Sequence, residues 1–153
     1  LIKNIMIENI THNSLNLAII IRASFQKEGI QFFTPDNYTQ QLAYMNRPAG
    51  YVIQPHLHNP VKREVEFTKE VIFIKSGMVR VDFYDESQKY LKSSVLHQGD
   101  VILLAYGGHG FEILENCEMI EVKQGPYAGE QDKTRFAPVD SNKIKFGDSD
   151  DSC

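Results

Sequence analysis

Tryptophan is absent from this chain of 153 residues, and cysteine occurs only twice, at Cys117 and Cys153. One pair of cysteines, with one member at the very end of the sequence, makes neither a disulfide framework nor a cysteine cluster for zinc. We therefore exclude a small disulfide-stapled fold and expect a reducing, cytoplasmic environment.

Long apolar runs and surplus positive charge are also lacking. No run approaches the roughly twenty apolar residues that cross a bilayer, and the opening Leu-Ile-Lys-Asn has neither block of a signal peptide. The first residue is Leu rather than Met, so we expect part of the natural N-terminus to lie outside this numbering. The net charge is -4, and no cluster of Lys and Arg indicates nucleic acid or an anionic membrane. A small molecule is the expected partner.

Strand-like segments make up nearly all of the patterned sequence. Residues 78–84 alternate between apolar side chains and the polar Arg80 and Asp82, which is typical of a strand with one face in water. Turn residues recur about every eight to twelve positions, including Gly77 and the Asn116-Cys117 pair. The sequence predicts an all-β sandwich or barrel with little helix.

The length fits one domain, which we place at residues 1–135. Residues 136–153 predict a flexible acidic tail, because they contain Pro, Gly and an Asp-Ser-Asp-Asp-Ser ending. The single short helix that we expect lies at 23–29. Three expected strands are apolar on both faces, so a second sheet, the N-terminal segment or a second subunit must cover them, and we expect a homodimer: 17–21, 71–74 and 101–105.

Four residues carry the spacing of metal ligands: His56, His58, Glu70 and His109. In an extended strand, His56 and His58 point the same way about 7 Å apart, close enough to converge on one ion. Glu70 opens an apolar strand and shares a face with apolar side chains, where a carboxylate is costly unless it has a partner. Three imidazoles and one carboxylate suit Fe, Mn, Co, Ni or Zn and leave coordination positions open.

The segment from Gly50 to Glu121 resembles the cupin family. The first cupin motif is a glycine, five residues, His-x-His, a spacer, then Glu, six residues and Gly; Gly50 and Gly77 occupy its two ends. Eleven residues, 59–69, stand where the family usually has a spacer of three or four. In the second motif Gly99 and His109 fit, but Ala105 replaces a proline, Ile113 replaces an asparagine, and one residue is missing.

This resemblance implies a double-stranded β-helix, or jelly roll, that binds one divalent transition metal through the four residues above. The sequence around these motifs also resembles a subgroup of small single-domain cupins; this resemblance covers most of the chain and implies no particular reaction. The long spacer leaves two alternative carboxylate ligands, Glu64 and Glu66, although only Glu70 opens a strand six residues before a turn glycine.

Further polar residues are weaker candidates for substrate contacts. Arg63 in the spacer could clamp a carboxylate or phosphate, and Tyr44 or Gln41 could reach the cavity from the preceding strand. Phe111, after His109, is expected to keep the site dry. A protein base for proton transfer could come from a few positions, none with a convincing placement: Tyr44, Lys75 and Glu112.

Three functions remain open from the sequence. The first is a metal-dependent isomerase, epimerase or lyase acting on a small polar metabolite such as a sugar derivative or keto acid. The second is an Fe(II)-dependent dioxygenase, which needs no protein base. The third is a non-catalytic module that binds a metal or a small ligand. The fold alone does not select among them.

Overall fold

The structure, a computed structural model, describes residues 5–147. Nearly all of its regular structure is β, as the sequence predicts, and the helices in that range are two short 3-10 turns, Gly129–Asp132 and Ser141–Lys143. Neither could span a membrane. The strands are β1 (Ile7–His12), β2 (Leu15–Ile21), β3 (Gly29–Phe32), β4 (Ala43–Asn46), β5 (Glu70–Tyr84), β6 (Tyr90–His97), β7 (Val101–Leu104) and β8 (Gly108–Lys123).

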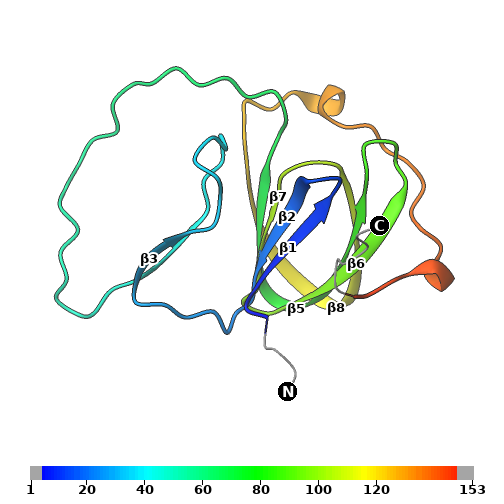
Figure 1. The fold of residues 1–153 in the computed structure, drawn as a ribbon, viewed down its shortest axis with the longest axis horizontal. Coiled ribbons are helices and arrows are strands. Elements are labelled where there is room, and N and C mark those ends of the chain that lie inside the picture. Colours follow the sequence, from blue (N-terminus) through cyan, green and yellow to red (C-terminus); the bar gives the residue numbers. More distant parts are fainter. Residues whose placement is uncertain (1–4, 148–153) are drawn as a thin grey trace.

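Six of these strands form one antiparallel sheet that curls into a half-barrel (Figure 1). Its order is β1-β2-β7-β5-β6, and β8 runs along β5. The pairing of β5 with β8 extends from Glu70 opposite Lys123 to Tyr84 opposite Gly108. Three register shifts interrupt it, and such bulges bend a ribbon and increase its twist. The long ribbon therefore closes one side of the half-barrel.

The chain does not turn at Gly77 or at Asn116, so both turn predictions are wrong. Each residue lies in the bulged middle of a continuous strand, one in β5 and the other in β8. Gly77 has a φ of +80°, and a Cβ there would lie 2.0 Å from the Asn116 carbonyl oxygen. Glycine is required because the strands touch at this point, and the glycine marks a bend rather than a reversal.

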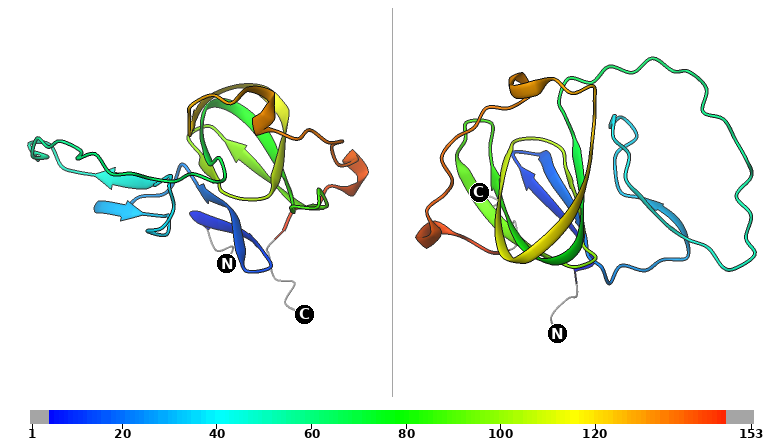
Figure 2. Two further views of the ribbon diagram at one scale, coloured as in Figure 1. Left: turned by 90° about the horizontal axis from the view of Figure 1, so that it is seen from above. Right: turned by 180° about the vertical axis from the view of Figure 1, so that it is seen from behind.

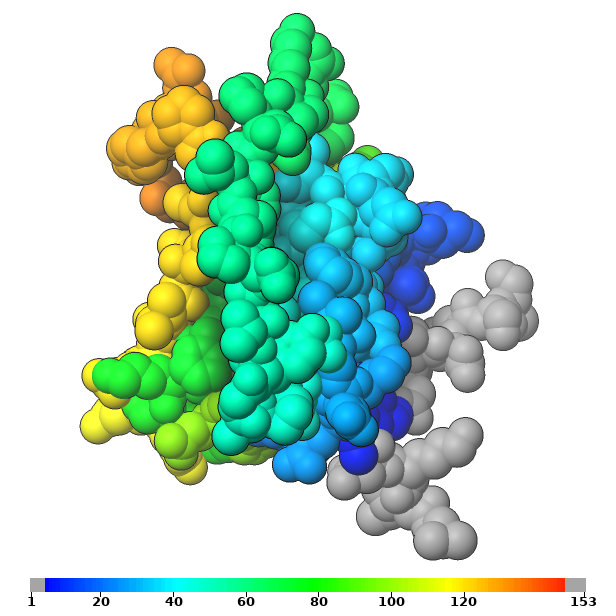
Figure 3. All heavy atoms as spheres, turned by 90° about the vertical axis from the view of Figure 1, so that its left-hand side faces the viewer, coloured from blue at the N-terminus to red at the C-terminus, as the bar shows by residue number. Residues whose placement is uncertain are grey.

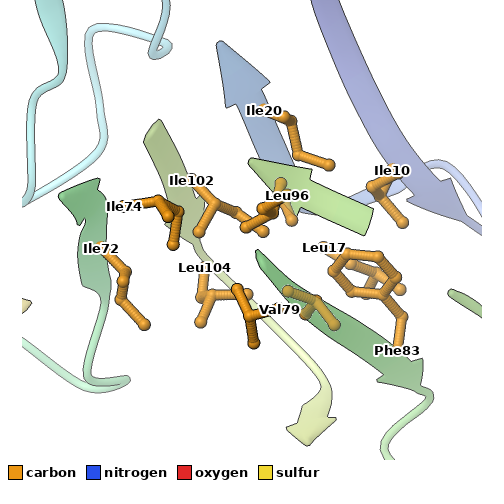
Figure 4. Packing of buried hydrophobic residues seen from close by; sticks show 12 residues of the cluster. Ile10, Leu17, Ile20, Ile72, Ile74, Val79, Phe83, Leu96, Ile102 and Leu104 are labelled. Atoms are coloured by element: carbon orange, nitrogen blue, oxygen red, sulfur yellow. The ribbon is translucent and has the colours of Figure 1, made fainter. Parts of the chain in front are cut away.

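Apolar side chains from β1, β2, β5, β6 and β7 meet in the hollow of the half-barrel (Figure 4). Each fully buried side chain of this size contributes about 1.5–3 kcal/mol relative to an exposed one. The predicted inward face of residues 78–84 is confirmed: Val79, Val81 and Phe83 are all buried. None of the buried residues of this cluster comes from β8.

The opposite face of residues 78–84 is not in water as predicted, because Asp82 is buried as well. Arg80 donates two hydrogen bonds to its carboxylate, at 2.7 and 3.0 Å, and the Ser93 hydroxyl donates another. A buried carboxylate is tolerated only with such partners. The strand therefore has an apolar inner face and an ion-paired outer face.

Part of the predicted tail, residues 136–147, is bonded to the half-barrel. The Ser93 N–H donates to the Lys145 carbonyl at 2.9 Å, and the Lys145 N–H donates to the Tyr90 hydroxyl at 2.8 Å. This segment lies along β6. The rest of the predicted tail, 148–153, lies outside the described residues.

The hairpin of β3 and β4 and the segment after it project from the half-barrel as an arm, which we define as residues 29–66 (Figures 1 and 2). The segment expected to form a helix, 23–29, is an irregular link into this arm. Every residue from 45 to 67 is exposed, and residues 47–69 form no strand. Figure 3, viewed from the side of the arm, shows the segment after β4 extended along that face.

Candidate metal centre

The side chains of Glu70 and His109 meet across the curled sheet. Glu70 is the first residue of β5, and His109 lies at the start of β8, opposite Phe83 at the far end of β5. Because the ribbon curls, its two ends approach, and His109 Nε2 lies 3.2 Å from Glu70 Oε2. Residues 39 positions apart thus form a contact that depends on the curvature of the sheet.

Glu70 is a buried carboxylate, with 6% of its surface exposed. The hydrogen bond from His109 lowers the pKa of Glu70, burial acts in the opposite direction, and the positive charges of Lys133 and Lys123 lower it further. The net shift is downward, so the carboxylate stays ionised at neutral pH. An ionised carboxylate beside an imidazole is a pair of metal-ligand type.

Apolar side chains flank this pair. The ring of Phe111 lies 5.5 Å from the imidazole of His109, at an interplanar angle of 64°. Ile72 follows Glu70 on the same face of β5 and is buried. Phe111 is therefore beside His109, where the sequence places it, although it is itself partly open to water.

His56 and His58 form a second pair, in the arm. Their ring centroids lie 5.2 Å apart, and the Nδ1 of His56 is 2.9 Å from the Gln54 carbonyl oxygen. Both residues are exposed, and the segment that carries them is irregular chain rather than the predicted strand. A strand needs a paired edge, and the structure provides none for this segment.

The four predicted ligands therefore lie in two pairs, one in the half-barrel and one in the arm. Within residues 5–147, no three His, Cys, Asp or Glu side chains converge in a way that could hold a metal ion. One oxygen and one nitrogen are too few for the tetrahedral or octahedral sites of transition metals. A single chain in this conformation does not fit the metal, and the four-ligand set stays a prediction.

The alternative carboxylates do not approach His109 in this structure either. Glu64 pairs with Lys62 at 3.5 Å on the exposed spacer. Glu66 lines a cleft of about 210 Å³ together with Gln124 and Tyr127. Of the three candidate carboxylates, the structure places only Glu70 against an imidazole.

The weaker candidates all make contacts elsewhere. Tyr44 packs edge-on against Phe25, with centroids 5.0 Å apart, and the Arg63 guanidinium donates to the Val61 carbonyl at 3.3 Å. The remaining candidates hold a loop or make ion pairs: Gln41 with the loop 34–38, Lys75 with Glu118, and Glu112 with Arg80. None of them is a partner of Glu70 or His109.

A buried cation that the sequence reasoning did not single out lies next to Glu70. The Lys69 ammonium lies 5.1 Å from the ring centroid of Tyr38 and 4.7 Å from that of Tyr106. The backbone N–H of Lys69 donates to the Gln124 side chain at 2.9 Å. Desolvation, followed by the influence of Tyr106, raises the pKa of Tyr38. The signal available in the sequence was a lysine at the start of an apolar strand, which alone does not identify its ring partners.

Comparison with known proteins adds no family or fold assignment. The chain matches no protein-family model, no curated protein and no solved structure.

Proposed function

We propose that the protein is a metal-binding barrel of cupin type that takes one divalent transition metal. The half-barrel supplies Glu70 and His109, and the arm supplies His56 and His58. The observation that carries the proposal is the buried Glu70 carboxylate, held ionised against the imidazole of His109. A carboxylate on the apolar face of β5 is costly to bury, and binding a cation would offset that cost.

The donor set limits the choice of metal. Three imidazoles and one carboxylate suit Fe, Mn, Ni or Zn, whereas Ca and Mg prefer sites made of oxygen. In this proposal the irregular segment around His56 and His58 becomes a strand when the two pairs meet, which would complete a double-stranded β-helix. The curled antiparallel sheet supports that fold because it already has the open edge that such a strand requires.

The proposed activity is metal-dependent chemistry on a small polar metabolite, of isomerase, epimerase or lyase type. When bound, a divalent metal would supply charge stabilisation for an oxygen-rich substrate. A dioxygenase is the second candidate, and a specific observation favours it: Tyr44, Lys75 and Glu112 contact side chains other than Glu70 and His109. Fe(II) dioxygenase chemistry needs no protein base. A non-catalytic binding module is the remaining alternative.

Elemental analysis of the purified protein tests the metal site. We expect near-stoichiometric transition metal in the native protein and a loss of most of it in the His56→Ala/His58→Ala variant. His97→Ala is the matched control, because His97 lies at the end of β6 and should leave the metal content unchanged. A native protein that holds no metal after anaerobic loading with Fe(II), Mn(II), Ni(II) or Zn(II) would refute the site.

Oxygen uptake then separates the two catalytic proposals. Fe(II)-loaded protein that consumes oxygen only when a candidate substrate is added would favour the dioxygenase. Turnover of a sugar derivative or keto acid without oxygen consumption would favour the isomerase or lyase. Stoichiometric metal with neither reaction would leave a binding module.

A further inference from the structure

Strand β8 has a long free edge. Among residues 5–147, its only strand partner is β5, so the other edge of its 16 residues leaves backbone donors and acceptors unpaired. All residues from 111 to 122 except Cys117 are exposed, and several are large and apolar: Phe111, Ile113, Leu114, Met119, Ile120 and Val122. Proteins normally cover such an edge, because it pairs readily with another chain.

The arm carries an extended apolar segment that lacks a partner. Within residues 50–58 the most exposed apolar side chains are Val52, at 72%, and Leu57, at 91%. In an extended conformation Val52, His56 and His58 lie on one face, and Leu57 lies on the other. A stretch of this kind adds readily as a strand to an open sheet edge. Residues 50–58 can therefore pair with part of the free edge of β8. They also carry the two histidines that Glu70 and His109 need to complete the proposed metal site.

The base of the arm directs this segment away from its own β8. The loop before β4 is held to the half-barrel, because the Gln124 amide donates to Thr39 at 2.6 Å and the Lys69 ammonium lies over the ring of Tyr38. From that anchored end β4 runs outward, and its last residue, Asn46, pairs with Gly29 at the start of β3. The following segment therefore begins at the outer end of the arm (Figure 1).

We infer that two copies of this chain exchange arms, so that residues 50–58 of one copy pair with the free edge of β8 in the other. His56 and His58 of one copy then complete the metal site begun by Glu70 and His109 of its partner. The shared metal site in this inference rests on the proposed function. The pairing of the arm with β8 does not depend on it. The exchange is reciprocal, which gives a closed twofold dimer with two shared sites and no free β8 edge.

The geometry explains three observations together. The two ligand pairs are separate in one chain, the arm is exposed throughout residues 45–67, and the exposed edge strand β8 carries six large apolar side chains among four glutamates. Pro55, which has no N–H to donate, fits a strand that is added at an edge. The long spacer 59–69 gives the chain the length to return from the partner's barrel to its own β5.

Mixing two defective variants tests the exchange. One chain carries His56→Ala and His58→Ala, the other carries Glu70→Gln and His109→Ala, and neither alone should hold metal. After co-refolding at equal amounts, about half of the dimers are mixed, and each mixed dimer has one complete site, so metal returns to about one quarter of the native level. No recovery in the mixture, with metal bound in the native protein, would mean that each arm closes on its own barrel.

A cross-link tests the exchange even if the native protein binds no metal. Val52→Cys, with the native Cys117 of β8 retained and Cys153→Ser in the background, is treated with a short bismaleimide. If the arms are exchanged, the reagent gives a covalent dimer on a denaturing gel. If each arm closes on its own barrel, it gives a monomer with an internal link. An internal link, or no link at all, would overturn the inference. Glu86→Cys, in the exposed turn between β5 and β6, is the control and should give no dimer.

Discussion

The half-barrel and the arm are built from the same kinds of residue, and they differ in what covers them. Val79, Val81 and Phe83 in β5 are shielded by the other strands, whereas Val52 and Leu57 in the arm lie in water. An apolar side chain stabilises a protein only when something removes it from water. The free energy of folding of one chain therefore resides in the half-barrel, and the arm has apolar surface available for association.

Truncation of a core side chain should have the largest effect. Phe83→Ala leaves a cavity among the strands of the half-barrel, and such changes cost about 3–5 kcal/mol of unfolding free energy. Urea unfolding of the variant measures the loss. Val61→Ala, in the exposed spacer of the arm, is the control and should change stability by less than about 0.5 kcal/mol. Equal losses in both variants would break the contrast between the two regions.

Loss of an ion pair should also destabilise the half-barrel more than the arm, with a smaller loss of stability than the core truncation. Asp82→Ala removes the carboxylate from a buried pair with Arg80 and should cost about 3 kcal/mol. The Arg80 guanidinium then keeps only the exposed Glu112 carboxylate, and the Ser93 hydroxyl loses its acceptor. Glu64→Ala breaks the exposed pair with Lys62 in the arm and should leave the melting temperature unchanged. Thermal unfolding of the two variants side by side makes the comparison. A stable Asp82→Ala protein would mean that Glu112 and water compensate the Arg80 charge without Asp82.

Gly77 and Gly50 have similar φ angles, so alanine substitutions at the two positions distinguish backbone strain from steric crowding of the added methyl group. Gly77→Ala adds a methyl group against the Asn116 carbonyl and should cost more than about 2 kcal/mol, beyond the strain of its positive φ. Gly50→Ala has a φ of +85° with no atom within 4 Å, so only the backbone strain of about 1 kcal/mol remains. Denaturant midpoints measure both losses. A milder effect at Gly77 than at Gly50 would show that the β5–β8 bulge can open.

The strand content and the inner face of β5 could be predicted from the sequence, because a period of two is a local signal. The curl could not, since it comes from register shifts between β5 and β8, which are far apart in the chain. The glycine and asparagine that mark those bulges have the same sequence signature as a turn. For that reason the predictions of reversals at Gly77 and Asn116 were wrong.

The candidate site also has a part that the sequence could predict and a part that it could not. Glu70 and His109 were selected by spacing and resemblance, and the structure places their side chains in contact. The His-x-His spacing predicts a strand around His56 and His58, yet a strand also requires an edge to pair with, and that edge lies outside the local sequence. The buried Lys69 was missed because its burial depends on Tyr38 and Tyr106, which come from other parts of the chain.

Thiol reactivity gives the mildest comparison of the two regions. Desolvation raises the pKa of Cys117, whose side chain packs against the core cluster beneath β8. At pH 7.5, a Cys introduced as Val61→Cys in the arm should react with a maleimide a few times faster, because thiolate is the reacting form. A Cys153→Ser background removes the other native thiol. The difference should shrink as the pH rises through the pKa of Cys117, since both thiols are then ionised. A constant rate ratio across the pH range would instead mean that access alone limits Cys117.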